Sequence, residues 1–253
     1  MPSKANLIQI LKNDLNQSSS EETKEWFENY LKGVIKYRGV KTPEVTKIVS
    51  RWAKEHKILD LDYLEQLDLA TALIHSEYAE DKFSGTIFIQ KFILAPLLKG
   101  SKKDSKNKEA LEASFLLEYF DTVIYQKGAF YDWSTNDWFV VRVLDPLLAA
   151  NLNLSSVLSD WASRENLWQR RSAILAFRHA AKDTTIHEII EKIIDKLVIE
   201  KERFIQTGIG WLISDLSKSH HDKAAALVEK YRGLLSKEVL KRHTKYLKLG
   251  QIS

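Results

Sequence analysis

The sequence contains no cysteine, only four prolines, nine glycines and one methionine among its 253 residues. Without cysteine, the chain can form neither a disulfide framework nor a zinc–thiolate site. The shortage of glycine and proline, together with almost no alternation of apolar and polar residues, favours helices over strands. No apolar run approaches the 18 or so residues that would span a bilayer, so no membrane partner is expected.

Motifs of several enzyme classes are also missing. The chain has no GxxxxGK[ST] phosphate loop, no GxGxxG fingerprint and no nucleophile elbow. Its seven histidines do not have the spacing of metal ligands, so we expect neither a metal nor a cofactor. The opening stretch MPSKANLIQILKNDL predicts an amphipathic helix rather than a signal peptide, and we expect a cytoplasmic protein.

The formal net charge of +4 is a weak indication of an anionic partner. Basic residues are concentrated in residues 164–182, where Glu165 is the one acid, and again in residues 230–248. Such a cluster is either a solvated helix surface or an anion-binding surface. Composition leaves both interpretations open.

Helix boundaries follow from capping signals. Ser20 precedes the acidic first turn and the apolar stripe of EETKEWFENYL. Thr42 is the predicted N-cap of the next helix, with Pro43 at its first position. Pro96 and Pro146 are expected to end or kink their helices. Further helices are predicted near 61–76, 83–99, 108–125, 137–150, 154–163, 166–182, 185–199, 202–217 and 223–247, with a loop at 99–108.

The chain also contains a degenerate internal repeat. LWQRRSAIL at 167–175 superposes on FIQTGIGWL at 204–212 with an offset of 37 residues, and NDWFVVRVL at 136–144 fits upstream. Helical repeats of the HEAT and armadillo kinds have periods near 40 residues. We therefore predict an all-α fold: a single domain over residues 1–253, built as a right-handed α-solenoid of HEAT-like repeats with a concave basic face.

The stretch YDWSTNDWFVV, residues 131–141, holds two tryptophans and two aspartates where a helix is about to begin. One capping side chain would be enough there. In the repeat alignment, Asp137, Arg171 and Trp211 fall at or near equivalent positions and would form a row along one surface. Singly, they can be explained as a helix cap, a surface cation and a core aromatic residue.

Four motifs in order resemble those of the AlkD-type DNA glycosylases, the HEAT-like repeat family of DNA alkylation repair enzymes. The first is the turn Gly39-Val40-Lys41-Thr42-Pro43, and the second is a tryptophan four residues before an aspartate, Trp133 and Asp137. The third is Trp168 followed by Arg171, and the fourth is Phe204-Ile205-Gln206 leading to Ile209-Gly210-Trp211. The similarity extends over most of the chain.

The second motif has an alternative register. Trp138 also precedes a polar residue by four positions, but that residue is Arg142 rather than an acid. Aligning on Trp138 would make the chain a catalytically inactive relative. Aligning on Trp133 retains the acid and its spacing to Arg171, and we adopt that register. Arg203, before Phe204, departs from the aromatic residue expected there.

The resemblance implies a glycosylase of base excision repair that hydrolyses the N-glycosidic bond of cationic N3- or N7-alkylated purines in duplex DNA. Asp137 would stabilise the positive sugar and hold the attacking water, while Trp133 and Trp211 would present electron-rich faces to the cation. The implied partner is duplex DNA containing alkylated purines, acted on by a monomer. The residues expected to contact nucleic acid are Arg171, Arg170, Arg178 and Phe204.

Two other functions remain open. A non-catalytic relative that binds damaged or branched DNA would share the basic face and differ at Asp137 and the tryptophans, which are intact here. A HEAT-type protein-interaction scaffold would need no row of Trp, Asp and Arg. Salt-dependent DNA affinity separates the scaffold from the other two, and excision from methylated DNA separates the enzyme from the binder.

Overall fold

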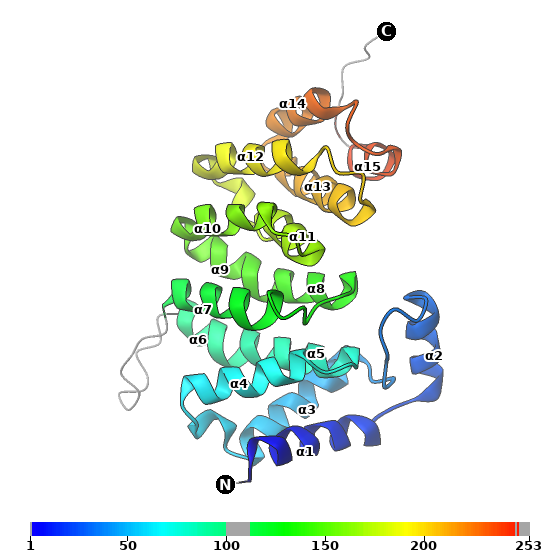
Figure 1. Ribbon diagram of the computed structural model, residues 1–253, viewed down its shortest axis with the longest axis vertical. Helices are drawn as coiled ribbons and strands as arrows, with labels where there is room; N and C mark the ends of the chain where they lie inside the picture. Colours follow the sequence, from blue (N-terminus) through cyan, green and yellow to red (C-terminus); the bar gives the residue numbers. More distant parts are fainter. Residues whose placement is uncertain (1, 100–111, 246, 248–253) are drawn as a thin grey trace. The chain divides into compact units, whose positions relative to one another are not determined.

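In the computed structural model of the chain, the described residues are 2–99, 112–245 and 247, and they fold mainly as helices (Figure 1). These residues contain no strand, and one isolated β-bridge joins Lys36 and Tyr78. The predicted all-α fold class is confirmed. None of the helices in these ranges combines the length and the apolar character needed to cross a membrane. Apart from Lys99, the loop predicted at 99–108 lies outside the described residues.

The chain divides into two compact units, residues 1–143 and 144–253, and each is described by itself. A single domain, a right-handed solenoid and a basic concave face therefore stay predictions. The helices of the first unit are α1 (Lys4–Gln17), α2 (Glu21–Tyr30), α3 (Thr42–Glu55), α4 (Tyr63–Ile74), α5 (Ala79–Phe88), α6 (Ala95–Leu98), α7 (Ala113–Phe120) and α8 (Trp133–Phe139). Those of the second are α9 (Asp145–Ala150), α10 (Ser155–Asp160), α11 (Leu167–Leu175), α12 (His187–Leu197), α13 (Arg203–Leu216), α14 (His221–Tyr231) and α15 (Lys237–His243).

Each unit is a stack of helices in chain order. In the first, α5 contacts α3 on one side and α8 on the other, and α4 pairs with α5. In the second, α13 contacts α11 and α15, while α12 and α14 pack beside it. Figure 1 shows this layering within each unit. The solenoid-like arrangement of helix pairs predicted from the repeat is present in both.

Large aromatic residues fill the cores. In the first unit the Trp52 side chain of α3 is 1% exposed, and its indole N–H donates to the Leu7 carbonyl of α1 at 2.9 Å. The ring of Phe88, from α5, meets Trp52 edge to face at 5.9 Å between centroids. In the second unit Trp161 and Phe177 are buried to the same degree. Burial of each such side chain stabilises the fold by roughly 3 kcal/mol.

Neither Pro96 nor Pro146 ends its helical run. Pro96 lies in α6 directly after the π-helical turn η2 (Ile89–Leu94), and Pro146 lies in α9 directly after the π-helical turn η4 (Val140–Leu144). Proline lacks the N–H of the α-helical hydrogen bond and clashes with the carbonyl four residues earlier. A π-turn shifts the bonding by one residue, which accommodates the ring and lets the helix continue.

The turn before α3 is held by a buried carboxylate. The backbone N–H groups of Arg38, Gly39 and Val40 donate to the two oxygens of Glu80, in the first turn of α5, at 2.8 to 3.0 Å. Burial raises the pKa of Glu80. The prediction that Thr42 is the N-cap was wrong: Lys41 occupies that position without a side-chain bond. The Glu80 carboxylate fixes the turn that leads into α3, while the Lys41 carbonyl accepts the N–H groups of Glu44 and Val45.

Gly39 is required by this turn. Its φ is +93°, and a Cβ there would lie 2.1 Å from the Ser20 carbonyl oxygen and 2.9 Å from the Lys24 amide nitrogen, which are both backbone atoms. Gly128 also has a positive φ, +65°, but a Cβ there would meet nothing within 4 Å.

Gly39→Ala should lower the free energy of unfolding by about 3 kcal/mol or more, because strain at positive φ is added to a clash with rigid backbone. Gly128→Ala adds only the backbone strain at positive φ and should lower the free energy of unfolding by about 1 kcal/mol. Urea unfolding of the two variants gives the comparison. Equal costs would mean that close packing at Gly39 is not what the turn depends on.

Candidate functional site

The start of α8 is set by Asp132, not by Asp137. The Asp132 carboxylate accepts the backbone N–H groups of Ser134 at 2.8 Å and Thr135 at 3.0 Å, and also both of their hydroxyls. The residue is 2% exposed. The sequence predicts a helix that begins at residue 137, but the helix begins at Trp133. The explanation of Asp137 as a cap was also wrong.

A buried lysine holds the segment that leads into this cap. The ammonium of Lys82, in α5, donates to the carbonyls of Ile74 at 2.7 Å and Ala129 at 2.6 Å, and lies 4.8 Å from the ring centroid of Tyr131. Burial lowers the pKa of Lys82 to about 8, in spite of the nearby Asp132 charge. The backbone before α8 is thus tied to α4 and α5.

Trp133 and Asp137 lie one turn apart on α8 and so share a face. Asp137 is 6% exposed, and the side-chain amide of Asn136 donates to its carboxylate at 3.4 Å. Trp133 is half-buried and meets the ring of Tyr30 edge to face, with 5.9 Å between the centroids. An acid and an electron-rich indole are therefore presented together, as the motif predicts.

Sequence reasoning missed the aromatic residues that accompany Trp133. Helix α2 buries none of its residues, and its Trp26 and Tyr30 are each 60% exposed. Their rings stack at 5.4 Å with 9° between the planes. The apolar stripe predicted for this helix thus faces outward in part. The sequence does indicate this contact, because Trp26 and Tyr30 are four residues apart, the spacing that brings side chains together on a helix.

In the second unit, Arg171 connects α11 to α13. Its guanidinium donates to the Phe204 carbonyl and, at 3.2 Å, to the Thr207 hydroxyl. It lies 5.7 Å from the ring of Trp211 and 5.9 Å from that of Phe204. Arg171 is 3% exposed, whereas Trp211 is half-buried. The structure brings together three predicted site residues, Arg171, Phe204 and Trp211, but it buries the arginine that was expected to contact phosphate.

Arg170 and Arg178 are each paired with an acid. Arg170 forms a 3.0 Å ion pair with Glu200, and Arg178 pairs with Asp215. The Arg178 guanidinium also lies 5.0 Å from the centroid of the Trp211 ring. Both arginine side chains remain about one-fifth exposed, at 19% and 21%. Their positive charge is reduced by these partners but stays accessible.

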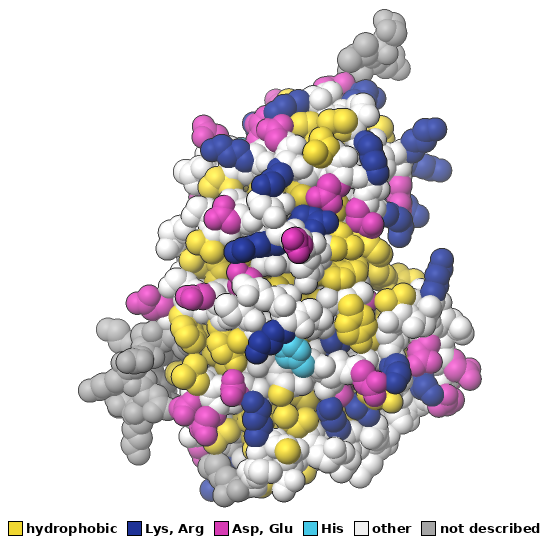
Figure 2. Space-filling model, viewed as in Figure 1, with side chains coloured by type: hydrophobic (Ala, Val, Ile, Leu, Met, Phe, Trp, Pro, Cys, Tyr) yellow, Lys and Arg dark blue, Asp and Glu magenta, His cyan; other side chains and the backbone are white. Residues whose placement is uncertain are grey.

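Next to Arg178 is a basic cleft of about 370 Å³, lined by Arg178, His179, Lys182, Asp215, Lys218 and Ser219. His179 is anchored there by Asp145, a fully buried acid whose pKa is raised by burial. On the face shown in Figure 2, basic and acidic side chains are interspersed over each unit. The cleft beside Arg178 is a local concentration of basic side chains in the second unit.

The predicted catalytic residues divide between the units. Trp133 and Asp137 belong to the first, and Trp211 and the arginines belong to the second. Their proposed joint action is an inference from the sequence motifs. Within residues 2–99, 112–245 and 247, no group of three or more His, Asp or Glu side chains is arranged to hold a metal ion.

The chain is similar to known proteins in both sequence and fold. A sequence model for a family described as "DNA alkylation repair enzyme" matches residues 11–247. Among solved structures, the chain is similar to a predicted DNA alkylation repair enzyme from Enterococcus faecalis, with a TM-score of 0.69 and 18% identity, covering 91% of this chain and 97% of that chain. At this identity the likeness shows a shared fold. No curated protein matches the chain.

The capping role of Asp132 can be measured. Asp132→Ala removes the acceptor of two backbone N–H groups and two hydroxyls, and should lower the free energy of unfolding by about 2 kcal/mol. Asp132→Asn keeps one carbonyl-type acceptor and should cost less than about 1 kcal/mol. Urea denaturation compares the two. If the alanine variant is as stable as the asparagine variant, Asp132 does not hold the start of α8.

Proposed function

Because this chain belongs to the DNA alkylation repair enzyme family, we propose that it is a DNA glycosylase of base excision repair. Its substrates would be purines in duplex DNA that carry a positive charge after alkylation at N3 or N7. The observation that most supports this proposal is the pairing of Asp137 with Trp133 on one face of α8, while Asp132 supplies the helix cap. Asp132, and not Asp137, caps the helix, so capping does not account for Asp137, and we assign its carboxylate a role in the reaction.

The reaction is a substitution at C1′ of the deoxyribose. The bond from C1′ to the base nitrogen breaks, and its electron pair neutralises the cationic purine as it leaves. The sugar passes through an oxocarbenium-like state, and water attacks C1′, losing a proton to give the abasic product. Since the base is already a good leaving group, what the enzyme must supply is negative potential beside the sugar.

Asp137 would supply that potential and orient the water. At about 4 Å and an effective dielectric near 20, a contact between a carboxylate and a cation is worth up to roughly 4 kcal/mol. If the contact forms only as the charge develops, the reaction is accelerated about a thousandfold. The burial of Asp137 strengthens such a contact relative to bulk water.

The exposed aromatic rings would favour a cationic base. A cation over an indole face gains about 0.5 to 2 kcal/mol. Trp133 and its neighbour Tyr30 offer such faces in the first unit, and Trp211 offers one in the second. Trp211 already contacts two guanidinium groups, those of Arg171 and Arg178. In each unit these aromatic residues tolerate positive charge nearby.

The arginines would position the DNA through its phosphates, without reading base sequence. Arg170 and Arg178 are the better placed for a first contact, because they are partly exposed, whereas Arg171 is buried against Phe204 and Trp211. Arg171 would reach a phosphate only if one of these aromatic residues moved. The charges of Arg178 and Lys218 are opposed locally by Asp215, with which both form ion pairs.

The catalytic proposal predicts the behaviour of Asp137→Asn. This change removes the charge and keeps the size, so release of N-methylpurines from alkylated duplex DNA should fall by two to three orders of magnitude. DNA affinity should persist or rise, because a negative group has been removed. Single-turnover kinetics, with chromatography of the released bases, give the rate constant.

Glu118→Gln is a suitable control, since Glu118 is an exposed acid of α7 outside the motif. Its excision rate should match the wild type. Asp145 is unsuitable because it is fully buried and bonded to His179. The assignment fails if Asp137→Asn excises N-methylpurines at the wild-type rate.

The DNA-binding proposal predicts that neutralising Arg178 and neutralising its partner Asp215 have opposite effects on DNA affinity. Arg178→Gln should weaken binding to duplex DNA and lower the slope of log affinity against log salt by about one. Asp215→Asn should tighten binding, because it frees Arg178 and Lys218 for phosphates. Fluorescence anisotropy at several salt concentrations measures both. An affinity that is independent of salt would rule out DNA as the partner.

A further inference from the structure

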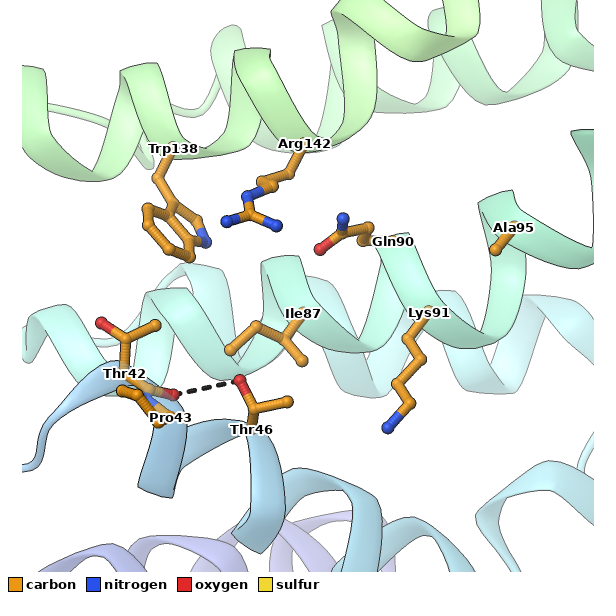
Figure 3. A pocket seen from close by; sticks show the side chains of 9 residues that line it. All are labelled: Thr42, Pro43, Thr46, Ile87, Gln90, Lys91, Ala95, Trp138 and Arg142. Carbon is orange, nitrogen blue, oxygen red and sulfur yellow. Dashed lines mark hydrogen bonds between the residues drawn. The ribbon is translucent and has the colours of Figure 1, made fainter.

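The first unit contains a cleft, lined by both apolar and polar side chains, that is distinct from the face of Trp133 and Asp137. Its volume is about 540 Å³, and it is bordered by the first turns of α3, by α5 with the turn η2, and by α8 with the turn η4 (Figure 3). Trp138 and Arg142 form one wall. At 100° per residue, Trp138 lies about 140° around α8 from Trp133. A ligand group in this cleft would therefore lie apart from a group beside Trp133 and Asp137.

Arg142 is held in place for a ligand. Its guanidinium lies 4.6 Å from the centroid of the Trp138 ring, and the ring of Phe83 packs against Trp138 at 5.4 Å. Figure 3 shows the guanidinium reaching over the cleft between Trp138 and Gln90. This contact restrains the guanidinium, and a guanidinium can bind two phosphate oxygens at once.

The cleft holds a second cation, Lys91, whose ammonium bonds to the Ser50 hydroxyl at 2.7 Å. Across the part of the chain that the structure describes, neither Arg142 nor Lys91 has a carboxylate within 4 Å. Both positive charges are therefore uncompensated by acids. The first turn of α3, with Thr42 and Thr46, adds hydroxyls and the positive end of a helix dipole.

The indole N–H of Trp138 gives an independent indication. The nitrogen is buried and has no hydrogen-bond partner among the described residues. Figure 3 shows it on the edge of the indole that faces the cleft. A buried donor without a partner costs about 1 to 3 kcal/mol, and a ligand oxygen in the cleft would remove that cost. The Trp138 indole N–H could thus donate to such a ligand.

We propose that this cleft binds a phosphate of the DNA backbone, with Arg142 as the principal donor, Lys91 as a second cation and Trp138 as the residue that positions Arg142. A stacked base is a poorer fit, because Arg142 and Phe83 already pack against the indole. This inference rests on the proposed DNA substrate and adds to it an anchoring point away from the Asp137 face. The contact is sequence-independent, so it governs affinity and not base choice.

The test is Arg142→Gln in the full chain, with an undamaged duplex as the ligand. Affinity should fall about tenfold or more, and the slope of log affinity against log salt should decrease by about one. Arg142→Lys keeps the charge but loses bidentate bonding, so it should retain the slope with intermediate affinity. Arg51→Gln is the matched control in the same unit: Arg51 pairs with Asp14 outside the cleft, and its removal should leave both quantities unchanged.

Several results would overturn the inference. One is an unchanged affinity and slope in Arg142→Gln, with a urea midpoint like that of the wild type. Another is that inorganic phosphate saturates the wild type but not Arg142→Gln, while both proteins bind the duplex equally. The cleft would then bind free phosphate and not DNA.

Excision assays distinguish the cleft proposal from the glycosylase proposal. A wild type that binds DNA through Arg142 but releases no base contradicts the glycosylase, whereas excision with no effect of Arg142 on binding contradicts the cleft.

Discussion

The bonds that the Asp132 carboxylate forms with the first turn of α8 determine the geometry of the first unit's polar surfaces. By ending the extended backbone at residue 132, they fix Trp133 as the first helical residue and so the direction of every side chain that follows. Lys82 fixes the segment just before, through two backbone carbonyls. If the helix started one residue later, each side chain would be displaced by about 100° around its axis.

From that start, the two tryptophans of YDWSTNDWFVV acquire separate roles. Trp133 shares a face with Asp137, and Trp138 contacts the guanidinium of Arg142, each pair being four residues apart. The two spacings that compete in the sequence thus face different directions around the helical run, and the register adopted for the catalytic motif stays a prediction. The pair with the acid suits stabilisation of a sugar cation, and the pair with the cation suits a phosphate. Of the two carboxylates, that of Asp132 caps the helix, and a catalytic role for Asp137 stays a prediction.

The helices and their pairing were predictable, because capping signals, apolar periodicity and the offset between 167–175 and 204–212 depend on local sequence. Side-chain partners were not. Thr42 has the right chemistry for a cap, but the Glu80 carboxylate, 38 residues later in the chain, secures that turn. Pro96 and Pro146 are helix breakers by local rules, and π-turns accommodate both. Arg171 reads as a surface cation, yet it is buried because α13 supplies a carbonyl and a hydroxyl for its guanidinium.

The charges of basic residues also depend on distant parts of the chain, because some of these residues pair with acids of a neighbouring repeat. In the second unit, Arg178 pairs with Asp215, 37 residues away, and Arg203 pairs with Glu238, 35 residues away. Both separations are close to the repeat period, so in each of these two pairs the acid lies about one repeat further along the chain. Counting charges within a segment therefore overestimates its field. Arg142 lies 4.6 Å from the centroid of the Trp138 ring and has no carboxylate within 4 Å among the described residues, although its own segment is not rich in basic residues. A strong interaction with phosphate depends on such unpaired cations and not on the most basic stretch of sequence.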